Sequence, residues 1–201
     1  MPTQTFLNLP NDKQMKIIQA CIDEFSTCPF SQASINQIIK KANISRGSFY
    51  QYFQDKEDCY MSVLNHVAHT KLSMFENIVH DLENVDIFTY LEKMLDATIE
   101  WVLKEPKLYQ VGYWMDYDDS LFIKKLLEHN KASTDFFAEL IKKDKEAKRI
   151  KAEVDEQLLT KILFVINKEV LMEGYKQQDF ELVKKQFSQV LAILKGGVAN
   201  V

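Results

Sequence analysis

The 201-residue chain is 46% hydrophobic and 27% charged, which is near the average for folded soluble domains and excludes a disordered or collagen-like polymer. It contains only 5 glycines and 4 prolines, and this depletion favours helices over a turn-rich all-β fold. The net charge of −4 excludes a protein that binds polyanions through a broad positive field. We therefore expect an all-α protein.

No membrane span or export signal is expected. No stretch reaches about 18 consecutive apolar residues, and residues 1–4 do not open a basic region followed by an apolar one. The three cysteines, Cys21, Cys28 and Cys59, are odd in number and lie in apolar or turn segments, so we interpret them as packing residues. We expect a cytoplasmic protein with no membrane partner.

Short helices follow an expected N-terminal tail at residues 1–10. Apolar residues repeat with helical spacing over 11–26, and the turn Thr27-Cys28-Pro29 ends that helix. Apolar residues at i, i+3, i+4 and i+7 then predict a second helix over 35–42. Ser34 is its expected N-cap, and Gln37 completes a capping box.

The turn Asn43-Ile44-Ser45 separates the second helix from a third. Asn43 tolerates the left-handed conformation that ends a helix, and Ser45 can cap the next helix, which we predict over 46–52. Asp55 is the expected N-cap of a long fourth helix that ends near Asn84.

Five more helices follow from the apolar spacing, so we predict about nine helices and no strand. They cover about 88–102, a short segment after Pro106, about 119–141, and two strongly patterned segments at about 158–170 and 180–194. The charged run from Lys142 to Lys151 is expected to be a solvated loop.

The second and third helices have the layout of a helix-turn-helix, although an ordinary helical hairpin has the same spacing. Phe49 and Phe53 are the expected inward anchors of the third helix. A glycine at position 47 lowers the stability of the helix by about 1 kcal/mol relative to alanine. The close approach of another backbone would explain why a glycine is present there. The expected outer face favours DNA binding because it is rich in hydrogen-bond donors and aromatic hydroxyl groups. It comprises Arg46, Gly47, Ser48, Tyr50, Gln51 and Tyr52.

A small basic patch and three helix N-termini are suited to phosphate groups. Residues 40–56 contain four basic residues and one acidic residue. The helix N-termini at Ser34, Ser45 and Asp55 offer free amide groups and a partial positive charge. Lys56 adds a full charge to the third of them.

The run from Ser34 to Lys56, SINQIIKKANISRGSFYQYFQDK, resembles the DNA-binding signature of the TetR family of transcriptional regulators. The resemblance is close over residues 11–60, and beyond them it extends only to length and helix pattern. Asn43 stands where glycine is usual and still permits the turn, whereas Ile39 stands where alanine is usual. The resemblance implies contact with double-stranded operator DNA through Ser34, Gln37, Lys41, Ser45, Arg46, Gly47, Ser48, Tyr50, Gln51, Tyr52 and Lys56.

The resemblance also implies a homodimer that responds to an unknown small-molecule effector, with no cofactor. It divides the chain into the tail, a DNA-binding domain at 11–70 with its motif at 34–53, and an effector-binding and dimerisation domain at 71–201. The last two helices of each subunit would form a four-helix bundle, and the expected interface residues are Leu159, Ile166, Phe187, Val190 and Leu194. The expected function is that of a repressor which the effector releases from a palindromic operator.

Aromatic residues gather in the middle of the chain, where they either pack the core or line the effector pocket. The candidate pocket residues are Trp101, Tyr109, Tyr113, Trp114, Tyr117, Phe137 and Phe164. The nearby carboxylates of Asp116, Asp118 and Asp119 either select a cationic ligand or form a solvated cap of the next helix, and we favour the cap.

Neither a metal site nor an enzyme active site is predicted. His66 and His69 are three residues apart, but no cysteine or carboxylate joins them at ligand spacing, so we interpret them as structural or solvated. The sequence has no Gly-rich phosphate loop and no Gly-x-Ser-x-Gly or His-Glu-x-x-His motif. The alternative function is a helical ligand carrier or enzyme that has a helix-turn-helix shape without DNA-binding activity.

Overall fold

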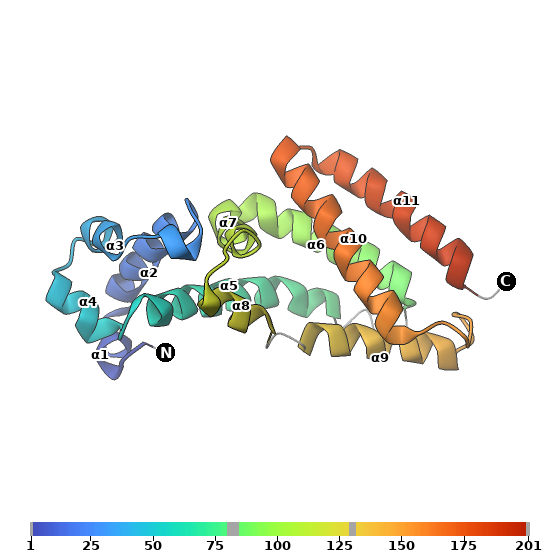
Figure 1. Cartoon of the computed structure of the whole chain (residues 1–201), viewed down its shortest axis with the longest axis horizontal. Coiled ribbons are helices and arrows are strands. Elements are labelled where there is room, and N and C mark those ends of the chain that lie inside the picture. Colours follow the sequence, from blue (N-terminus) through green and yellow to red (C-terminus); the bar gives the residue numbers. More distant parts are fainter. Residues whose placement is uncertain (1, 80–84, 129–131, 200–201) are drawn as a thin grey trace. The chain divides into compact units, whose positions relative to one another are not determined.

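The chain is helical throughout the part that the structure describes, as predicted (Figure 1). The structure is a computed structural model, and it describes residues 2–79, 85–128 and 132–199. In these ranges it has eleven α-helices, one 3-10 helix and no strand, against the nine helices expected. The additional helices are α1 (Gln4–Leu7) and the pair α8 (Leu121–Glu128) and α9 (Ala132–Glu146), where a single helix was predicted.

The other helices lie close to their predicted positions. The end of the fourth predicted helix, near Asn84, falls outside the described residues. In chain order these elements are α2 (Asn11–Phe25), η1 (Phe30–Gln32), α3 (Ile35–Ala42), α4 (Arg46–Tyr52), α5 (Lys56–Val79), α6 (Ile87–Lys104), α7 (Pro106–Met115), α10 (Glu156–Gln177) and α11 (Phe180–Val198).

The chain forms two compact units. The head unit comprises Met1–Ser73 together with Trp101–His129, and the bundle unit comprises Met74–Glu100 together with Asn130–Val201. The family resemblance implies one C-terminal domain from residue 71 onward, whereas in the structure the segment that carries α7 and α8 packs with the head.

Aromatic rings hold α7 and α8 onto the head unit. The Phe30 ring lies 4.7 Å from the ring of Phe122 on α8 and 5.1 Å from that of Tyr60 on α5. Trp114 on α7 donates its indole N–H to the backbone oxygen of Ser26, 3.0 Å away. Buried rings and one directed hydrogen bond therefore attach both helices to the segment that precedes α3.

The first ten residues are not the simple tail that we expected. Thr3 caps α1, and Phe6 is buried with its ring 5.1 Å from that of Phe53 and 6.0 Å from that of Tyr52. The backbone N–H of Thr3 donates to the oxygen of Tyr52 at 3.0 Å. This short helix therefore covers the C-terminal end of α4.

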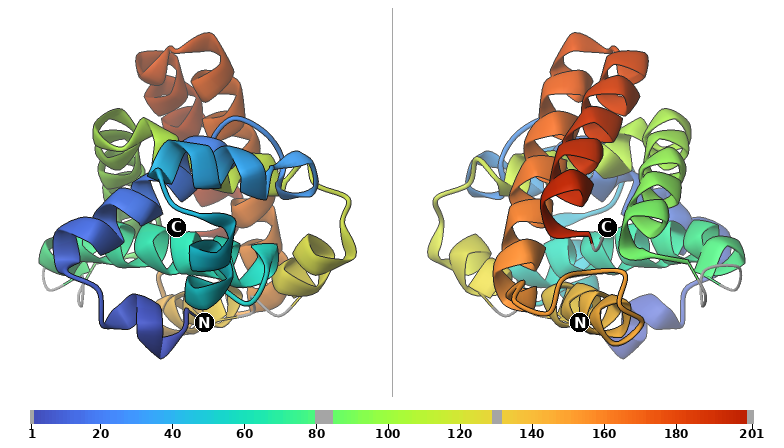
Figure 2. Two further views of the ribbon diagram at one scale, coloured as in Figure 1. Left: turned by 90° about the vertical axis from the view of Figure 1, so that its left-hand side faces the viewer. Right: turned by 90° about the vertical axis from the view of Figure 1, so that its right-hand side faces the viewer.

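The bundle unit is built on the antiparallel pair α10 and α11, which lie side by side in Figures 1 and 2. The two helices approach closely at Gly174, because a Cβ atom there would lie 1.7 Å from a methyl carbon of Val183. The core between these helices, α6 and α9 comprises Ile87, Phe88, Leu91, Leu95, Ile99, Ile141, Ile150, Leu159, Leu163, Val183, Phe187 and Leu191.

The charged run at 142–151 is only in part the solvated loop that we expected, because α9 continues to Glu146 and Asp144 is only 2% exposed, whereas most of the other charged side chains are exposed. Asp144 accepts a hydrogen bond from the backbone N–H of Ile87 at 2.8 Å and forms an ion pair with Arg149. A buried carboxylate is stable when it is paired in this way, so the run closes one end of the bundle unit.

The described residues contain no helix that is both long and apolar enough to cross a membrane. Cys21, Cys28 and Cys59 are free thiols. Cys21 and Cys59 are fully buried with their Sγ atoms 3.2 Å apart, whereas Cys28 is half-buried.

Candidate nucleic-acid interface

The helices α3 and α4 are joined by the three-residue turn that the sequence predicted (Figure 2, left). Asn43 has a φ of 54° and ends α3 in the left-handed conformation. The hydroxyl of Ser45 accepts from the backbone N–H of Ser48 at 3.0 Å and so caps α4. Ile38, Phe49 and Phe53 are fully buried, which holds the two helices at a defined angle.

Ser34 occupies the N-cap position of α3, but its hydroxyl makes no capping hydrogen bond, and the predicted capping box is wrong. Instead, Glu24 on α2 accepts a hydrogen bond from the backbone N–H of Ser34 at 2.9 Å. Lys41 forms an ion pair with the same carboxylate at 3.0 Å and donates to the backbone oxygen of Asp23 at 3.1 Å. The buried carboxylate of Glu24, on another helix, therefore accepts the backbone N–H at the start of α3 that we expected a local cap to bind. It also holds the Lys41 ammonium against α2.

Four of the predicted contact residues form an exposed polar face on α4: Arg46, Gly47, Tyr50 and Gln51. The Arg46 guanidinium donates to the side-chain oxygen of Asn36 on α3 at 3.0 Å and lies 5.6 Å from the Tyr50 ring centre. Asn36 is exposed and was missed by the sequence reasoning, although its place on the polar side of α3 marks it. Gln37 is exposed on the same short helix.

Nothing in the described part of the chain requires a glycine at position 47. Its φ is not positive, and the nearest atom to an added Cβ would be the Ser45 oxygen at 3.7 Å, an ordinary contact. The chain would therefore accept alanine here, and the absence of a side chain leaves the first turn of α4 open to close approach from outside.

Tyr52 does not lie on the outer face of α4, because it is only 6% exposed and packs against Phe6. The prediction was wrong because α1, which covers this position, was taken as a tail. Ser48 is half-buried, and its hydroxyl lies 2.8 Å from that of Ser45.

The ammonium group of Lys56 points into the head unit. Its Nζ donates to the backbone oxygens of Phe30 at 2.8 Å, Ala33 at 3.1 Å and Ser31 at 3.3 Å, and it lies 4.5 Å from the Phe30 ring centre. These three acceptors use the three N–H donors of the ammonium. In this conformation Lys56 holds the η1 turn, which leads into α3.

The residues predicted for the dimer interface separate into two groups. Leu159 and Phe187 lie inside the core of the bundle unit, and Leu194 packs against it, so they already have apolar partners within the subunit. Ile166 and Val190 are half-buried. The most exposed apolar side chains on α10 and α11 are different residues: Leu158, Val165 and Ile193, which are 58%, 62% and 74% exposed.

The candidate pocket residues also separate. Trp101, Tyr109, Tyr113, Trp114 and Tyr117 belong to the head unit, whereas Phe137 and Phe164 belong to the bundle unit. The rings of Phe137 and Phe164 meet edge to face at 5.1 Å. With Leu91, Leu163 and Asn167 they line a small cavity of about 30 Å³.

Asp118 is not the solvated cap that we favoured. It is 7% exposed and accepts from the backbone N–H of Ser31 at 2.7 Å and from that of Ser120 at 2.8 Å. Burial raises the pKa of its carboxyl group, but these hydrogen bonds outweigh that effect, and the pKa lies below its ordinary value. Lys56 and Asp118 therefore hold the η1 turn from two sides.

Comparison with known proteins agrees with this geometry. Residues 17–63 match the model for bacterial regulatory proteins of the tetR family. YvdT of Bacillus subtilis, an uncharacterized HTH-type transcriptional regulator, is 33% identical over 98 residues, which cover 49% of this chain. The match spans 47%, about half, of that relative's length.

Solved structures resemble the chain over nine tenths of its length or more. A TetR family transcriptional regulator from Chloroflexus aurantiacus has a TM-score of 0.73 and 26% identity, with 100% of both chains covered. FadR from Bacillus subtilis, solved in complex with stearoyl-CoA, has a TM-score of 0.73 over 91% of this chain and 98% of that chain. At 19% identity, the second likeness concerns the fold alone.

Proposed function

We propose that the chain is a cytoplasmic transcriptional regulator of the tetR family and not an enzyme, since residues 17–63 match that family's model and a TetR family regulator has the same fold. It binds double-stranded operator DNA as a homodimer, and a small molecule releases it. The observation that carries this proposal is the exposed polar face of α4, which stands on a fully buried apolar base.

The proposed DNA contacts come from α3 and α4. Arg46 and Gln51 have the donors and acceptors that read base edges in the major groove. Tyr50 and the capped N-terminus of α4 face phosphate groups, and Gly47 lets the sugar-phosphate backbone come close. Asn36 orients Arg46 through their 3.0 Å hydrogen bond.

The proposed dimer forms through the outer face of α10 and α11. One recognition helix contacts few bases. A two-fold dimer provides a second recognition helix and binds a pseudo-palindrome whose half-sites lie about 34–36 Å apart. Val170, Val190 and Ile193 line an open groove of about 470 Å³ between the two helices, with glutamine and glutamate side chains at its edge. An apolar centre with a polar rim is typical of a subunit interface.

The proposed effector site is in the bundle unit, around Phe137 and Phe164. The cavity of about 30 Å³ has room for only one or two water molecules, so an effector must separate these rings to enter. Asn167 lines the cavity, and one turn away from the Leu163–Phe164 pair the buried hydroxyl of Thr160 has no hydrogen-bond partner among the described residues. An apolar molecule with one hydrogen-bonding group fits this environment.

Selection of DNA from a random library by the full-length protein tests the proposal. We expect a pseudo-palindromic site that is bound with strong salt dependence. Arg46→Ala should weaken binding by about 1–3 kcal/mol and relax the preference at one position in each half-site. Gln157→Ala, on the exposed surface of α10, is the control and should leave binding unchanged. If no sequence-selective, salt-sensitive complex forms, the chain is a ligand carrier or an enzyme instead.

A further inference from the structure

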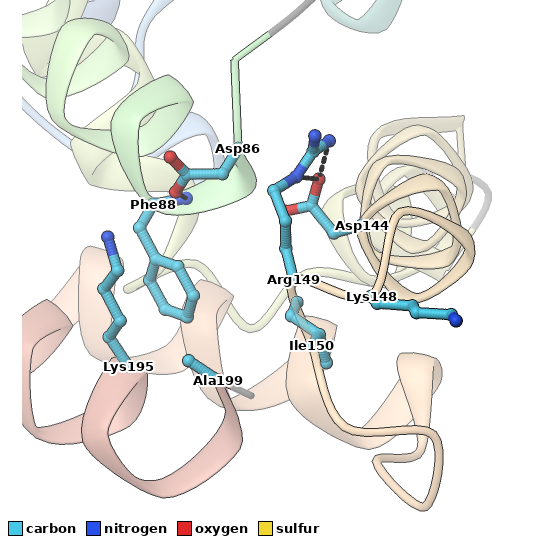
Figure 3. Close-up of a pocket in the computed structure, with 8 residues that line it drawn as sticks. All are labelled: Asp86, Phe88, Asp144, Lys148, Arg149, Ile150, Lys195 and Ala199. Carbon is cyan, nitrogen blue, oxygen red and sulfur yellow. Dashed lines mark hydrogen bonds and ion pairs between the residues drawn. The ribbon is translucent and has the colours of Figure 1, made fainter. Parts of the chain in front are cut away.

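A second cleft lies in the bundle unit where α6 begins and α9 and α11 end, and it shares no lining residue with the Phe137–Phe164 cavity. Its volume is about 330 Å³, which is near the lower limit for small-molecule sites. Phe88, Ile150 and Ala199 form an apolar surface in it, and the side chains of Arg149 and Lys195 stand on opposite sides (Figure 3). The cleft therefore combines an apolar floor with two cationic walls.

The two carboxylates in the cleft are already occupied by hydrogen-bond donors of the subunit. Asp86 accepts from the backbone N–H groups of Phe88 at 3.0 Å and Thr89 at 3.2 Å, and from the Thr89 hydroxyl at 2.8 Å. Asp144 accepts from Ile87 and Arg149. Burial raises the pKa of Asp86, but the hydrogen bonds from Thr89 and the charge of Lys195 bring it below the ordinary value. Both carboxylates thus accept hydrogen bonds from the N-terminus of α6. Their oxygens are therefore poorly suited to bind a cation.

The cationic groups, in contrast, retain donors that no hydrogen bond among the described residues uses. Arg149 bonds to Asp144 through Nε and Nη2, so its Nη1 group is available to a ligand. Lys195 lies with its Nζ 5.8 Å from the Phe88 ring centre, a weak contact that leaves its N–H groups in the cleft. The side chain of Lys148 points away from the cleft in Figure 3, so the charged groups beside the apolar floor are Arg149 and Lys195 together with Asp86 and Asp144.

We propose that this cleft binds a small organic carboxylate whose short apolar group lies on Phe88, Ile150 and Ala199. Arg149 and Lys195 bind the carboxylate oxygens from opposite sides. The site excludes large polyphosphates by its size and its two carboxylates, and it is unsuited to a divalent cation because both carboxylates already accept hydrogen bonds from the subunit. It is separate from the effector site proposed above and does not depend on DNA binding.

Titration of the full-length protein with sodium benzoate, followed by ¹H–¹⁵N NMR, tests the proposal. We expect saturable shifts of the Phe88, Ile150 and Ala199 amide signals. Benzamide, which has the same ring without the charge, and inorganic phosphate, which has charge without the ring, should each bind at least about tenfold more weakly. Shifts confined to Leu163, Phe164 and Asn167 would mean that benzoate enters the other cavity, and they would overturn the proposal.

Two variants probe the two halves of the cleft without changing the Asp144–Arg149 ion pair. Lys195→Gln should weaken benzoate binding about fivefold, the loss expected for one partly exposed ion pair. Ala199→Leu keeps all the charges, but its larger side chain occupies the space above the apolar surface of the cleft. It should therefore abolish benzoate binding. Lys185→Gln, an exposed lysine of the same helix, is the control for charge. Equal binding of benzamide or phosphate, or unchanged affinity in Lys195→Gln, would show that the cleft is not a carboxylate site.

Discussion

Lys56→Met removes the ammonium group that holds the η1 turn and keeps a side chain of similar length. Of the three hydrogen bonds lost, those to Phe30 and Ala33 are partly buried, whereas the bond to Ser31 is exposed and water can replace it. A hydrogen bond to a charged group contributes about 1.5–3 kcal/mol. We take the two partly buried bonds at the low end and expect the free energy of unfolding of the head unit to fall by about 2–3 kcal/mol.

Tryptophan fluorescence during urea unfolding measures this change, because both tryptophans, Trp101 and Trp114, belong to the head unit. With a urea dependence of about 1.5–2 kcal/mol per molar, the midpoint should fall by about 1–2 M. Lys40→Met removes the same charge from an exposed position on α3 and should leave the midpoint nearly unchanged.

The salt dependence of DNA binding gives the second half of the test. A lysine that contacts phosphate contributes about 0.9 to the slope of log K against log salt concentration. We expect Lys56→Met to leave that slope unchanged, because the ammonium is occupied by backbone oxygens of the head. An unchanged urea midpoint together with a slope reduced by about 0.9 would show that Lys56 binds DNA directly, and the reasoning would then be wrong.

Three further predictions follow from the dimer face, the η1 turn and the effector site. Ile193→Glu should convert the protein to a monomer at micromolar concentration in analytical ultracentrifugation, whereas Lys185→Glu should not, and a dimer in both would exclude this face. Asp118→Asn should destabilise the head unit at neutral pH. Because the folded pKa of Asp118 is depressed, its contribution is complete above about pH 4 and is lost as the pH falls through the folded value, so the variant's urea midpoint should change less on acidification; an identical acid dependence would contradict this. An effector that releases operator DNA should itself bind more weakly, by the same factor of about 5–150, when operator is present, and calorimetry that finds equal affinities would refute coupling.

The sequence by itself determined the local helical structure of the DNA-binding head. Asn43 ends α3 and Ser45 caps α4, as predicted, because a turn or cap depends on residues within about four positions along the chain. The predicted exposure of Arg46 and Gln51 on α4 is confirmed, because for these residues exposure depends only on that helix and its buried anchors.

Only the tertiary structure decided what covers each apolar helix face and which groups pair with each charged side chain. An apolar stripe says that a helix face is buried but not what covers it, so Leu159 and Phe187 were assigned to a second subunit although their own core contains them. Tyr52 is buried by a helix some 45 residues earlier in the chain. Lys56 finds its acceptors more than twenty residues away, and such distant pairings depend on how the helices pack.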